Sequence, residues 1–450
     1  MKALNLKPRA VLPAIVILLI HASPSPAQSS CIGPEVRLGN TFIQIAPTGS
    51  DDTENIQCAL DLAVENRIPE IRLTRGDFFI SAVSARGFYG SLQGGGRDHT
   101  RIRVLGQSVD CEAIAARGEA TAAIKFIGGE PRVRWLTLAV DSNIWPCSQG
   151  AGSGLSAMVH FTGHPATASD CPMDVVYGTI DRVNLEGPGN NQIGPQEVAA
   201  GVLAKPEGAG PPDCHQGLLG SIKINRSHIR GFRLGAWLEM RGNAHISVFN
   251  SDFDLNHTGL EIDDSNAIVT VFGNRFASKS PGSYSCCEGG GVGMAIQNLA
   301  DTAGLTRIDV RGNTFNVSSG GFDSAWGIRL TARSAATAVD AVISDNHFQL
   351  SGGEPVATAV ASHSVSGGLL SDNLITRLQG SGLFFEVTAD AMGQADRWTV
   401  VSNRGLAESH GPYLQHYDIW LGENSSNSLI GPGQAAVVSD GGIDNITLPQ

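Results

Sequence analysis

The chain has 450 residues, of which 55 are glycine and only 16% are charged. This composition is typical of a chain that turns often and buries many short strands, and it argues against long helices. The formal net charge of −12 disfavours general nucleic-acid binding, because that binding depends largely on cations that neutralise phosphates.

The N-terminal segment has the pattern of a secretion signal. Lys2, Lys7 and Arg9 precede an apolar stretch, and a small-residue Ser-Pro-Ala site ends at Ala27. We therefore expect a signal peptide over residues 1–27 and a secreted or periplasmic protein. The apolar stretch is too short to span a bilayer, and no later segment approaches that length, so no membrane span is expected.

The cysteine count supports export, because an even set behind a secretion signal favours disulfides. The eight cysteines are Cys31, Cys58, Cys111, Cys147, Cys171, Cys214, Cys286 and Cys287. We expect Cys31 to pair with Cys58, which would fasten the N-terminal arm to the helix described next. Cys286 and Cys287 would form a vicinal bridge, and the other pairings stay open.

Residues 28–70 are predicted to form an N-terminal arm and a single helix. Asp51 and Glu54 have the spacing of a capping box, and apolar residues such as Ile56 and Leu60 recur at helical spacing. We expect the helix to run from Asp52 to Asn66. One amphipathic helix is enough to cover the open end of a strand-built solenoid, whose edge would otherwise invite aggregation.

Residues 71–450 carry two repeated patterns that predict an all-β, right-handed parallel β-helix of about a dozen coils with an N-terminal capping helix. In the first pattern a small polar residue and any residue precede Phe or Ile, starting at Ser227, Ser251, Asn274, Asn313, Asn346 and Asn373. In the second, Gly precedes an apolar–any–apolar run, starting at Gly235, Gly259, Gly293, Gly327 and Gly382. The shortest steps equal about one coil, which rises about 4.8 Å. The aromatic residues should stack in one interior column, and each Asn should hydrogen-bond to the next coil.

Three segments near the start resemble the entry of the pectate-lyase-like β-helix superfamily. They are Ala46–Gln57, Arg75–Ile80 and Leu92–Asp98, with Arg75 standing where proline is usual. The resemblance implies the same right-handed parallel β-helix. Members are mainly polysaccharide lyases, hydrolases and epimerases, with tailspikes and non-catalytic surface proteins among them. It therefore implies a polysaccharide partner without fixing one reaction.

The outward positions of the Gly-initiated strands are the predicted ligand face, because alternate side chains form parallel columns on a flat sheet. One predicted column holds Trp237, Glu261, Ala295, Arg329, Phe384 and Trp420, and the second holds Glu239, Asp263, Gln297, Thr331 and Glu386. Glu239 and Asp263 would then lie about 4.8 Å apart. Carboxylates that close raise one another's pKa, as a general acid beside a nucleophile or base requires. The candidate catalytic residues are Glu239, Glu261, Asp263 and Arg241.

Cations and aromatic residues complete the candidate site. Five cations fall within a short stretch, Lys223, Arg226, Arg230, Arg233 and Arg241, and they would neutralise uronate carboxylates. The candidate substrate-binding residues are Trp237, Arg329, Phe384 and Trp420. The alternative is that all of these are ordinary solvated strand and turn residues.

Two functions remain open from the sequence. The first is a polysaccharide lyase or glycoside hydrolase, and the second is a non-catalytic glycan-binding or surface β-helix protein. The acidic cluster would also suit Ca²⁺, which takes six to eight oxygen ligands, so a cofactor stays undecided. The sequence sets no oligomeric state.

Overall fold

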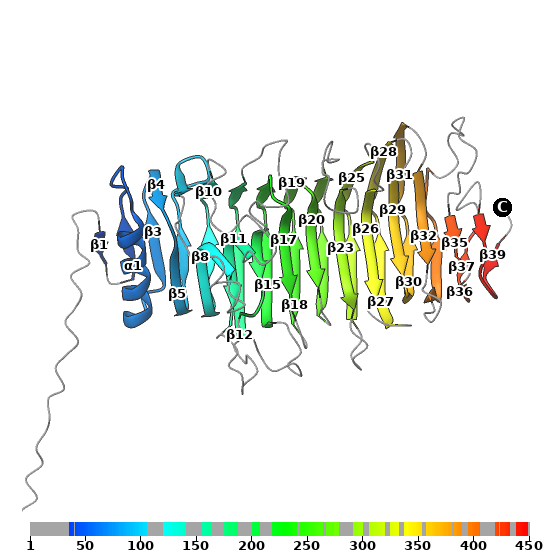
Figure 1. The fold of residues 1–450 in the computed structure, drawn as a ribbon, viewed down its shortest axis with the longest axis horizontal. Helices are drawn as coiled ribbons and strands as arrows, with labels where there is room; N and C mark the ends of the chain where they lie inside the picture. The colour runs from blue at the N-terminus through cyan, green and yellow to red at the C-terminus, as the bar shows by residue number, and fades with distance from the viewer. Residues whose placement is uncertain are drawn as a thin grey trace, which may run out of the picture.

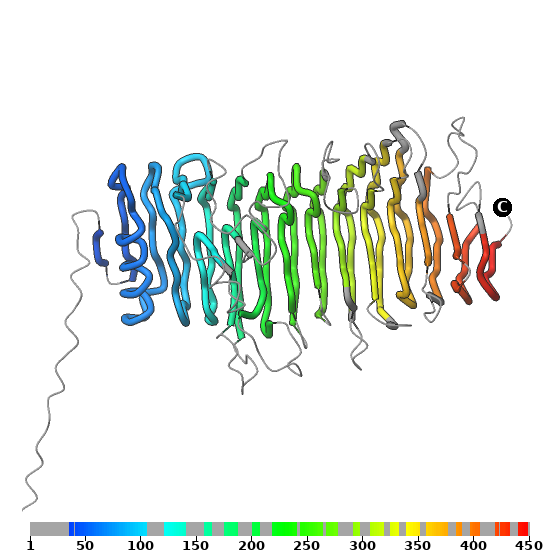
Figure 2. The backbone as a smooth tube through the Cα atoms, viewed as in Figure 1, coloured from blue at the N-terminus to red at the C-terminus, as the bar shows by residue number. Residues whose placement is uncertain are grey.

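Short parallel strands, each pairing with the equivalent strand of the next coil, form three long stacks in the computed structural model. Figure 1 shows an elongated solenoid with its helix at the N-terminal end, and Figure 2 shows the successive coils lying over one another. The structure describes residues 36–39, 41–105, 120–140, 155–163, 175–187, 200–207, 218–240, 244–263, 267–278, 291–299, 306–319, 325–332, 337–352, 357–379, 382–388, 395–405, 419–422, 424–432 and 438–448.

Stack I is a separate ten-stranded parallel sheet. Its strands are β4 (Gly76–Ile80), β7 (Thr100–Val104), β10 (Thr137–Val140), β13 (Asn184–Glu186), β16 (His228–Arg230), β19 (Asp252–Asn256), β22 (Arg275–Ser278), β25 (Thr314–Ser319), β28 (His347–Gly352) and β31 (Leu374–Gln379).

Stack II follows stack I in each coil. Its strands are β5 (Val83–Phe88), β8 (Ala120–Gly129), β11 (Leu155–Thr162), β14 (Ala200–Ala204), β17 (Leu234–Glu239), β20 (Thr258–Asp263), β23 (Val292–Leu299), β26 (Ala325–Ala332), β29 (Ala357–His363), β32 (Gly382–Thr388), β35 (Ile419–Leu421) and β38 (Val438–Asp440).

Stack III completes the coil. Its strands are β2 (Ile43–Ile45), β3 (Glu70–Leu73), β6 (Ser91–Gln93), β9 (Arg132–Arg134), β12 (Val175–Asp181), β15 (Leu219–Asn225), β18 (His245–Phe249), β21 (Ile268–Phe272), β24 (Thr306–Arg311), β27 (Thr337–Ser344), β30 (Val365–Ser371), β34 (Trp398–Val401), β37 (Leu429–Ile430) and β39 (Ile446–Thr447). β1 (Val36–Leu38) pairs antiparallel with β2, and a small separate sheet joins β33 (Ala395–Asp396) to β36 (Ser425–Ser426).

The single helix of the described residues, α1 (Thr53–Asn66), buries Ile56, Ala59, Leu60 and Ala63 in the same core as the first strands. The expected capping box does not form. Asp52, the N-cap residue, instead accepts hydrogen bonds from the backbone N–H groups of Thr48 at 2.8 Å and Phe79 at 3.0 Å. Its carboxylate therefore fastens the helix start to β4, and the helix begins one residue later than predicted.

The predicted interior column of aromatic residues is confirmed. Phe253, Phe276, Phe315 and Phe348 stack with ring centroids 4.9–5.0 Å apart. The glycines of the second repeated pattern lie against this column of phenylalanine rings. A Cβ added to Gly235, Gly259, Gly293 or Gly327 would lie 2.8–2.9 Å from a ring carbon of the phenylalanine in the following coil. The glycine of each stack II strand thus makes room for the ring that stack I contributes.

The corner between stacks III and I is nearly invariant, and we call it the III–I corner. From β9 onward the connection is two residues, the first with φ between 47° and 67° and the second buried. In the later coils the second residue is Asn. Asn274, Asn313, Asn346 and Asn373 each donate a side-chain hydrogen bond to the Oδ1 of the next Asn at 2.9–3.1 Å, ending on Asn403. The predicted coil-to-coil bonding of these residues is confirmed.

Candidate functional site

Most of the added chain length lies beside stack II, which draws attention to the outward face of that stack. The III–I corner takes two residues, but β7 ends at Val104 and β8 begins only at Ala120, and β14 ends at Ala204 with β15 starting at Leu219. Long connections beside a rigid scaffold are where binding residues concentrate. We call the outward side chains of stack II the stack II face.

The predicted register of this face is confirmed over four coils. Trp237 pairs with Glu261, Glu261 with Ala295, and Ala295 with Arg329. In the neighbouring column Glu239 pairs with Asp263, which pairs with Gln297. Residues predicted to be lateral neighbours from the repeat spacing therefore are neighbours.

The predicted column is wrong at its C-terminal end. Phe384 is fully buried, and it is Glu386 that pairs with Ala361 on one side and Trp420 on the other. Val360 pairs with Ile328 in the preceding coil and with Phe385 in the following coil. Phe384, the residue before Phe385, therefore takes the inward position that Gly327, the residue before Ile328, holds two coils earlier. Phe384 is thus a core residue and not a sugar-stacking surface.

Glu261 is the most perturbed carboxyl group of the face. Burial, together with the nearby negative charges of Asp263 and Glu239, raises its pKa to about 7, although Arg233 and Arg329 act in the opposite direction. A carboxyl group with this pKa holds and releases a proton near neutral pH, which general acid–base catalysis requires.

Glu239, whose catalytic role stays a prediction, is held in an ion pair within the protein. It is 3% exposed, and its Oε1 accepts a hydrogen bond from Lys205 Nζ at 2.6 Å. The same ammonium lies 4.9 Å from the ring centre of Trp237. Lys205 therefore occupies one side of the predicted stacking platform and neutralises the predicted catalytic carboxylate.

Glu386 lies four coils from Glu261 in the same column, and its environment resembles that of Glu261. Burial raises its pKa, and the positive charges of Arg329 and His363 oppose that shift. Its neighbour Trp420 is 39% exposed, which leaves an aromatic surface accessible at that end of the face. Arg329 lies over the ring of Trp326 at 4.9 Å from its centre.

A buried cluster that the sequence analysis did not single out lies further toward the N terminus. Lys125 Nζ donates to Glu207 Oε1 at 2.8 Å, and the fully buried His160 has its Nδ1 3.5 Å from the same oxygen. Burial lowers the pKa of His160 to about 4. Lys125 and His160 are register neighbours on β8 and β11. Their signal in the sequence was a polar residue at the centre of an otherwise apolar strand.

The predicted strip of five cations does not exist as one surface. Lys223 lies on stack III, Arg226 at the III–I corner and Arg230 on stack I, and among the four described cations of this set Arg233 alone influences the pKa of Glu261. Residues close in sequence are spread around a coil because each coil visits three faces. Arg241 lies outside the described residues, so its predicted role stays a prediction.

Two further findings concern metals and membranes. The described residues contain no group of three or more His, Cys, Asp or Glu side chains placed to hold a metal ion, so the calcium alternative gains no support. No helix within the described part of the chain is long and apolar enough to cross a bilayer. Cys31 lies outside the described residues, and its pairing with Cys58, like the predicted boundaries at residues 27 and 70, stays a prediction.

Comparison with known proteins defines the fold. No family model and no curated protein matches the sequence. Among solved structures, the chain is similar to the Dettilon tailspike protein gp208, at 12% identity and a TM-score of 0.56, over 90% of this chain and 68% of that one. It also aligns with the A-module of the Azotobacter vinelandii mannuronan C-5 epimerase AlgE4, at 13% identity and a TM-score of 0.42, over 89% and 94%.

A third alignment, to the Streptococcus pneumoniae surface protein and adhesin PfbA, has 14% identity and a TM-score of 0.44, over 79% and 97% of the two chains. The likeness to the tailspike protein and the parallel pairing of successive coils show the fold, which is a right-handed parallel β-helix.

Proposed function

We propose that this protein is an exported enzyme that binds an extended polysaccharide along the stack II face and hydrolyses it at Glu261 and Asp263. The substrate class is supported by the fold, which the resemblance associates with polysaccharide-acting proteins, and by the shape of the face. Side chains of successive coils repeat at about 4.8 Å, so the face offers equivalent positions to a repeating polymer.

The main support for the proposed reaction is the proton affinity of Glu261. Its pKa of about 7 leaves a large protonated fraction at neutral pH, so Glu261 serves as the general acid that protonates the leaving oxygen. Asp263 supplies the second carboxyl group that glycoside hydrolysis requires.

The spacing of these two residues selects a stereochemical outcome. Glu261 and Asp263 are alternate residues of β20, so their backbones lie about 6.6 Å apart and their side chains leave the same face. Inverting glycosidases hold their carboxyl groups about 6.5–9.5 Å apart, whereas retaining enzymes hold them about 5–5.5 Å apart. The backbone spacing of the pair on β20 is nearer the inverting range, and on that basis we assign Asp263 as the base that activates water.

The electrostatics of the face also admit an acidic polymer. Arg233, one coil before Glu261, and Arg329, two coils after it, both act on the charge of Glu261. Two guanidinium groups beside the reacting carboxyl group would attract a uronate carboxylate, and a charge-assisted pair of this kind orients the sugar.

A panel of pectate, alginate, glycosaminoglycan and neutral glycans tests this function. Reducing-end release without ultraviolet-absorbing unsaturated products is expected, and proton NMR of the first product should show the inverted anomer. Glu261→Gln and Asp263→Asn should each lower kcat by about 10²–10⁴-fold. Glu386→Gln is the matched control, because it changes a carboxyl group of the same column four coils away. Unsaturated products would instead assign a lyase.

One observation favours the non-catalytic alternative. Lys205 already neutralises Glu239, so one of the three predicted carboxylates is used within the protein. Binding of a glycan to the stack II face without turnover of any polymer in the panel would establish that alternative and exclude the hydrolase.

A further inference from the structure

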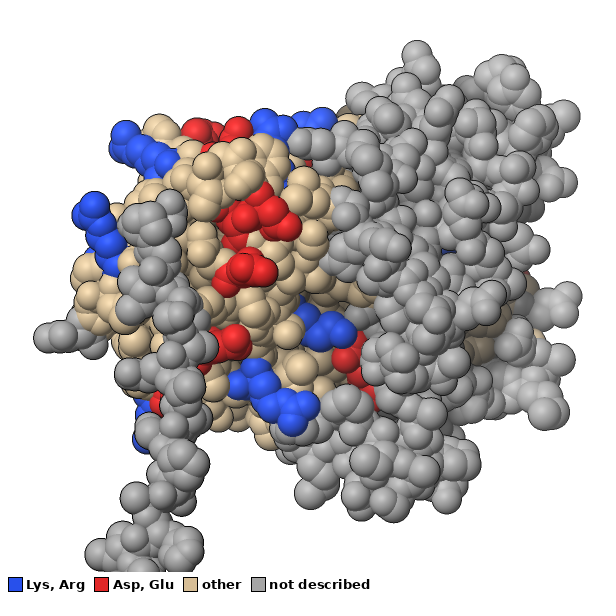
Figure 3. All heavy atoms as spheres, turned by 60° about the vertical axis from the view of Figure 1, so that its left-hand side comes forward, with Lys and Arg blue, Asp and Glu red and all other residues tan. Residues whose placement is uncertain are grey.

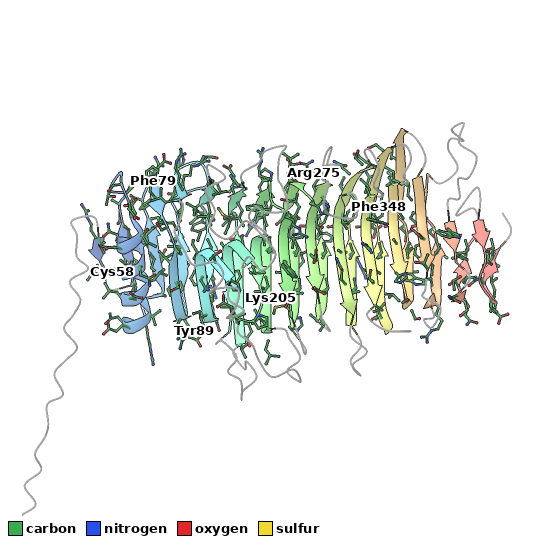
Figure 4. All side chains as sticks on the ribbon, in the orientation of Figure 1. Cys58, Phe79, Tyr89, Lys205, Arg275 and Phe348 are labelled. Carbon is green, nitrogen blue, oxygen red and sulfur yellow. The ribbon has the colours of Figure 1, made fainter. Side chains whose placement is uncertain are left out.

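A polar pocket lies at the III–I corner, on a different side of the coil from the stack II face. Its volume is about 610 Å³, and its lining residues are Arg97, Asp98, Arg182, Asn184, Arg226, Ser227, His228, Asn250 and Asp252. We call it the corner pocket. Figure 4 shows the separation of the two regions: Arg275, the ion-pair partner of Asp252, lies near the upper edge of the solenoid, and Lys205 lies in its lower half.

Two adjacent columns form the floor of the pocket. Arg182, Arg226 and Asn250 are the first residues of three successive III–I corners, and Asn184, His228 and Asp252 are register neighbours on stack I. Arg97 belongs to the longer connection between β6 and β7. Its Nη1 donates to Asn184 Oδ1 at 3.3 Å, so the guanidinium reaches the same floor from the N-terminal side.

The residue types at the corner are unusual for their backbone. The first corner residue has a left-handed conformation in every coil from β9 on, which favours glycine and short polar residues. Later coils follow that preference with Gly273, Gly312 and Asp345. Arg182 and Arg226 place long cationic side chains there in consecutive coils. A disfavoured residue kept at such a position points to a function of its side chain.

The charge of the pocket favours an anion, although the whole chain is acidic. Of its two aspartates, Asp252 is paired with Arg275 at 3.0 Å. Of its three arginines, Arg226 is shared with Asp181, Arg97 bonds to a neutral amide, and Arg182 makes no side-chain hydrogen bond or ion pair with the described residues. His228 adds a buried Nε2 that has no hydrogen-bond partner in the described part of the chain.

We infer that the corner pocket binds an oxyanion, the carboxylate or sulfate group of an acidic glycan, through Arg97, Arg182 and Arg226. Guanidinium groups bind such anions through pairs of parallel N–H donors, and the backbones of the two corners that carry Arg182 and Arg226 lie about 4.8 Å apart. His228 also lines the pocket, and its Nε2 makes no hydrogen bond within the described residues and lies 4.0 Å from Asp252 Oδ2. The site would hold the glycan on the side of the solenoid away from Glu261, independently of any cleavage.

Calorimetric titration of the full chain with sodium sulfate, sodium glucuronate and glucose tests the inference. Sulfate and glucuronate should bind saturably and glucose should not, and raised sodium chloride should weaken both anions. Arg182→Gln and Arg97→Gln should each weaken binding by about tenfold or more. Arg230→Gln is the control, because it removes an exposed arginine of the same coil that does not line the pocket.

The inference is overturned if neither anion binds, if glucose binds as well as glucuronate, or if Arg230→Gln weakens binding as much as Arg182→Gln. Thermal unfolding of each variant confirms that the fold is retained. Glu261→Gln should keep full sulfate affinity, so failure of the hydrolase assignment and failure of the corner pocket give different results.

Discussion

Asp263 raises the pKa of Glu261 from two residues along β20, with both side chains on the stack II face. The same column places Gln297 beside Asp263 in the next coil. A charge placed at residue 297 therefore acts on the same proton, because it lies within a few strand spacings of Glu261.

This relationship predicts an adjustable pH profile. With Glu261 as the acid, kcat should fall above about pH 7, where Glu261 loses its proton. Gln297→Glu should move that fall to higher pH and Gln297→Lys to lower pH, each by up to about one unit. The measurement is kcat against pH for the three proteins. A fall that stays at the same pH in both variants would remove Glu261 from the acid role.

Glu261 should also make stability depend on pH. Its folded pKa of about 7 exceeds its ordinary value of 4.5, so the folded state binds the proton more tightly. The resulting stabilisation is complete below pH 4.5 and is lost as the pH rises through 7. Glu261→Gln should unfold like the wild type at pH 4 and be more stable at pH 8, by at most about 3 kcal/mol. Urea unfolding at the two pH values measures this difference.

His160 should have the opposite effect. Burial lowers its pKa from 6.5 to about 4, so the neutral form contributes stability above pH 6.5 that is lost as the pH falls through 4. His160→Gln keeps an N–H donor for the carbonyl oxygen of Lys205 and removes the titration. The variant should lose less stability than the wild type between pH 6.5 and 4, by at most about 3 kcal/mol. Equal acid sensitivity in both proteins would contradict the assignment.

The asparagine ladder should be a major source of stability. Asn346 donates to Val310 O and to Asn373 Oδ1, and it accepts from Asn313. Asn346→Ala leaves several buried polar groups unpaired, and it should lower the free energy of unfolding by about 3–5 kcal/mol. Gln349→Ala removes an amide of the same coil that points outward from β28, and it should cost less than about 1 kcal/mol. Denaturant midpoints compare the two.

The glycine repeat should be sensitive to a single methyl group. At Gly293 a Cβ would lie 2.7 Å from the carbonyl oxygen of Gly327 and 2.8 Å from Phe315. Gly293→Ala should therefore destabilise the fold by about 1–3 kcal/mol. Adding Phe315→Leu shortens the opposing side chain and should recover part of that loss. A double variant no more stable than the sum of the single changes would show that the two residues are not coupled.

Much of the coil arrangement followed from spacing alone. A polar residue two positions before Phe, then a glycine before an apolar run, is enough to align Phe253 with Phe276 and Glu239 with Asp263. The local rule fails where the repeat changes. In the coil of Phe384, Gly382 does not occupy the position that the repeated glycine holds in the earlier coils. The pairing of Val360 with Phe385 is needed to show which side chains face outward.

The electrostatic partners were harder to predict from the sequence. Lys205 reaches Glu239 from the preceding coil. It lies in a connection outside the repeated patterns, so the repeats could not predict this contact. The convergence of Arg97 on the corner likewise depends on a segment that crosses neighbouring coils. Figure 3 shows acidic and basic side chains interspersed over the N-terminal end, a mixture that net charge does not reveal.

The two-residue III–I corner must keep its length, whereas the connections beside stack II can vary in length. Insertions at that corner would break the chain of amide side chains, whereas insertions beside stack II leave it intact. Loops beside stack II can therefore differ in length without disturbing the asparagine hydrogen bonds that hold successive coils in register at the III–I corner.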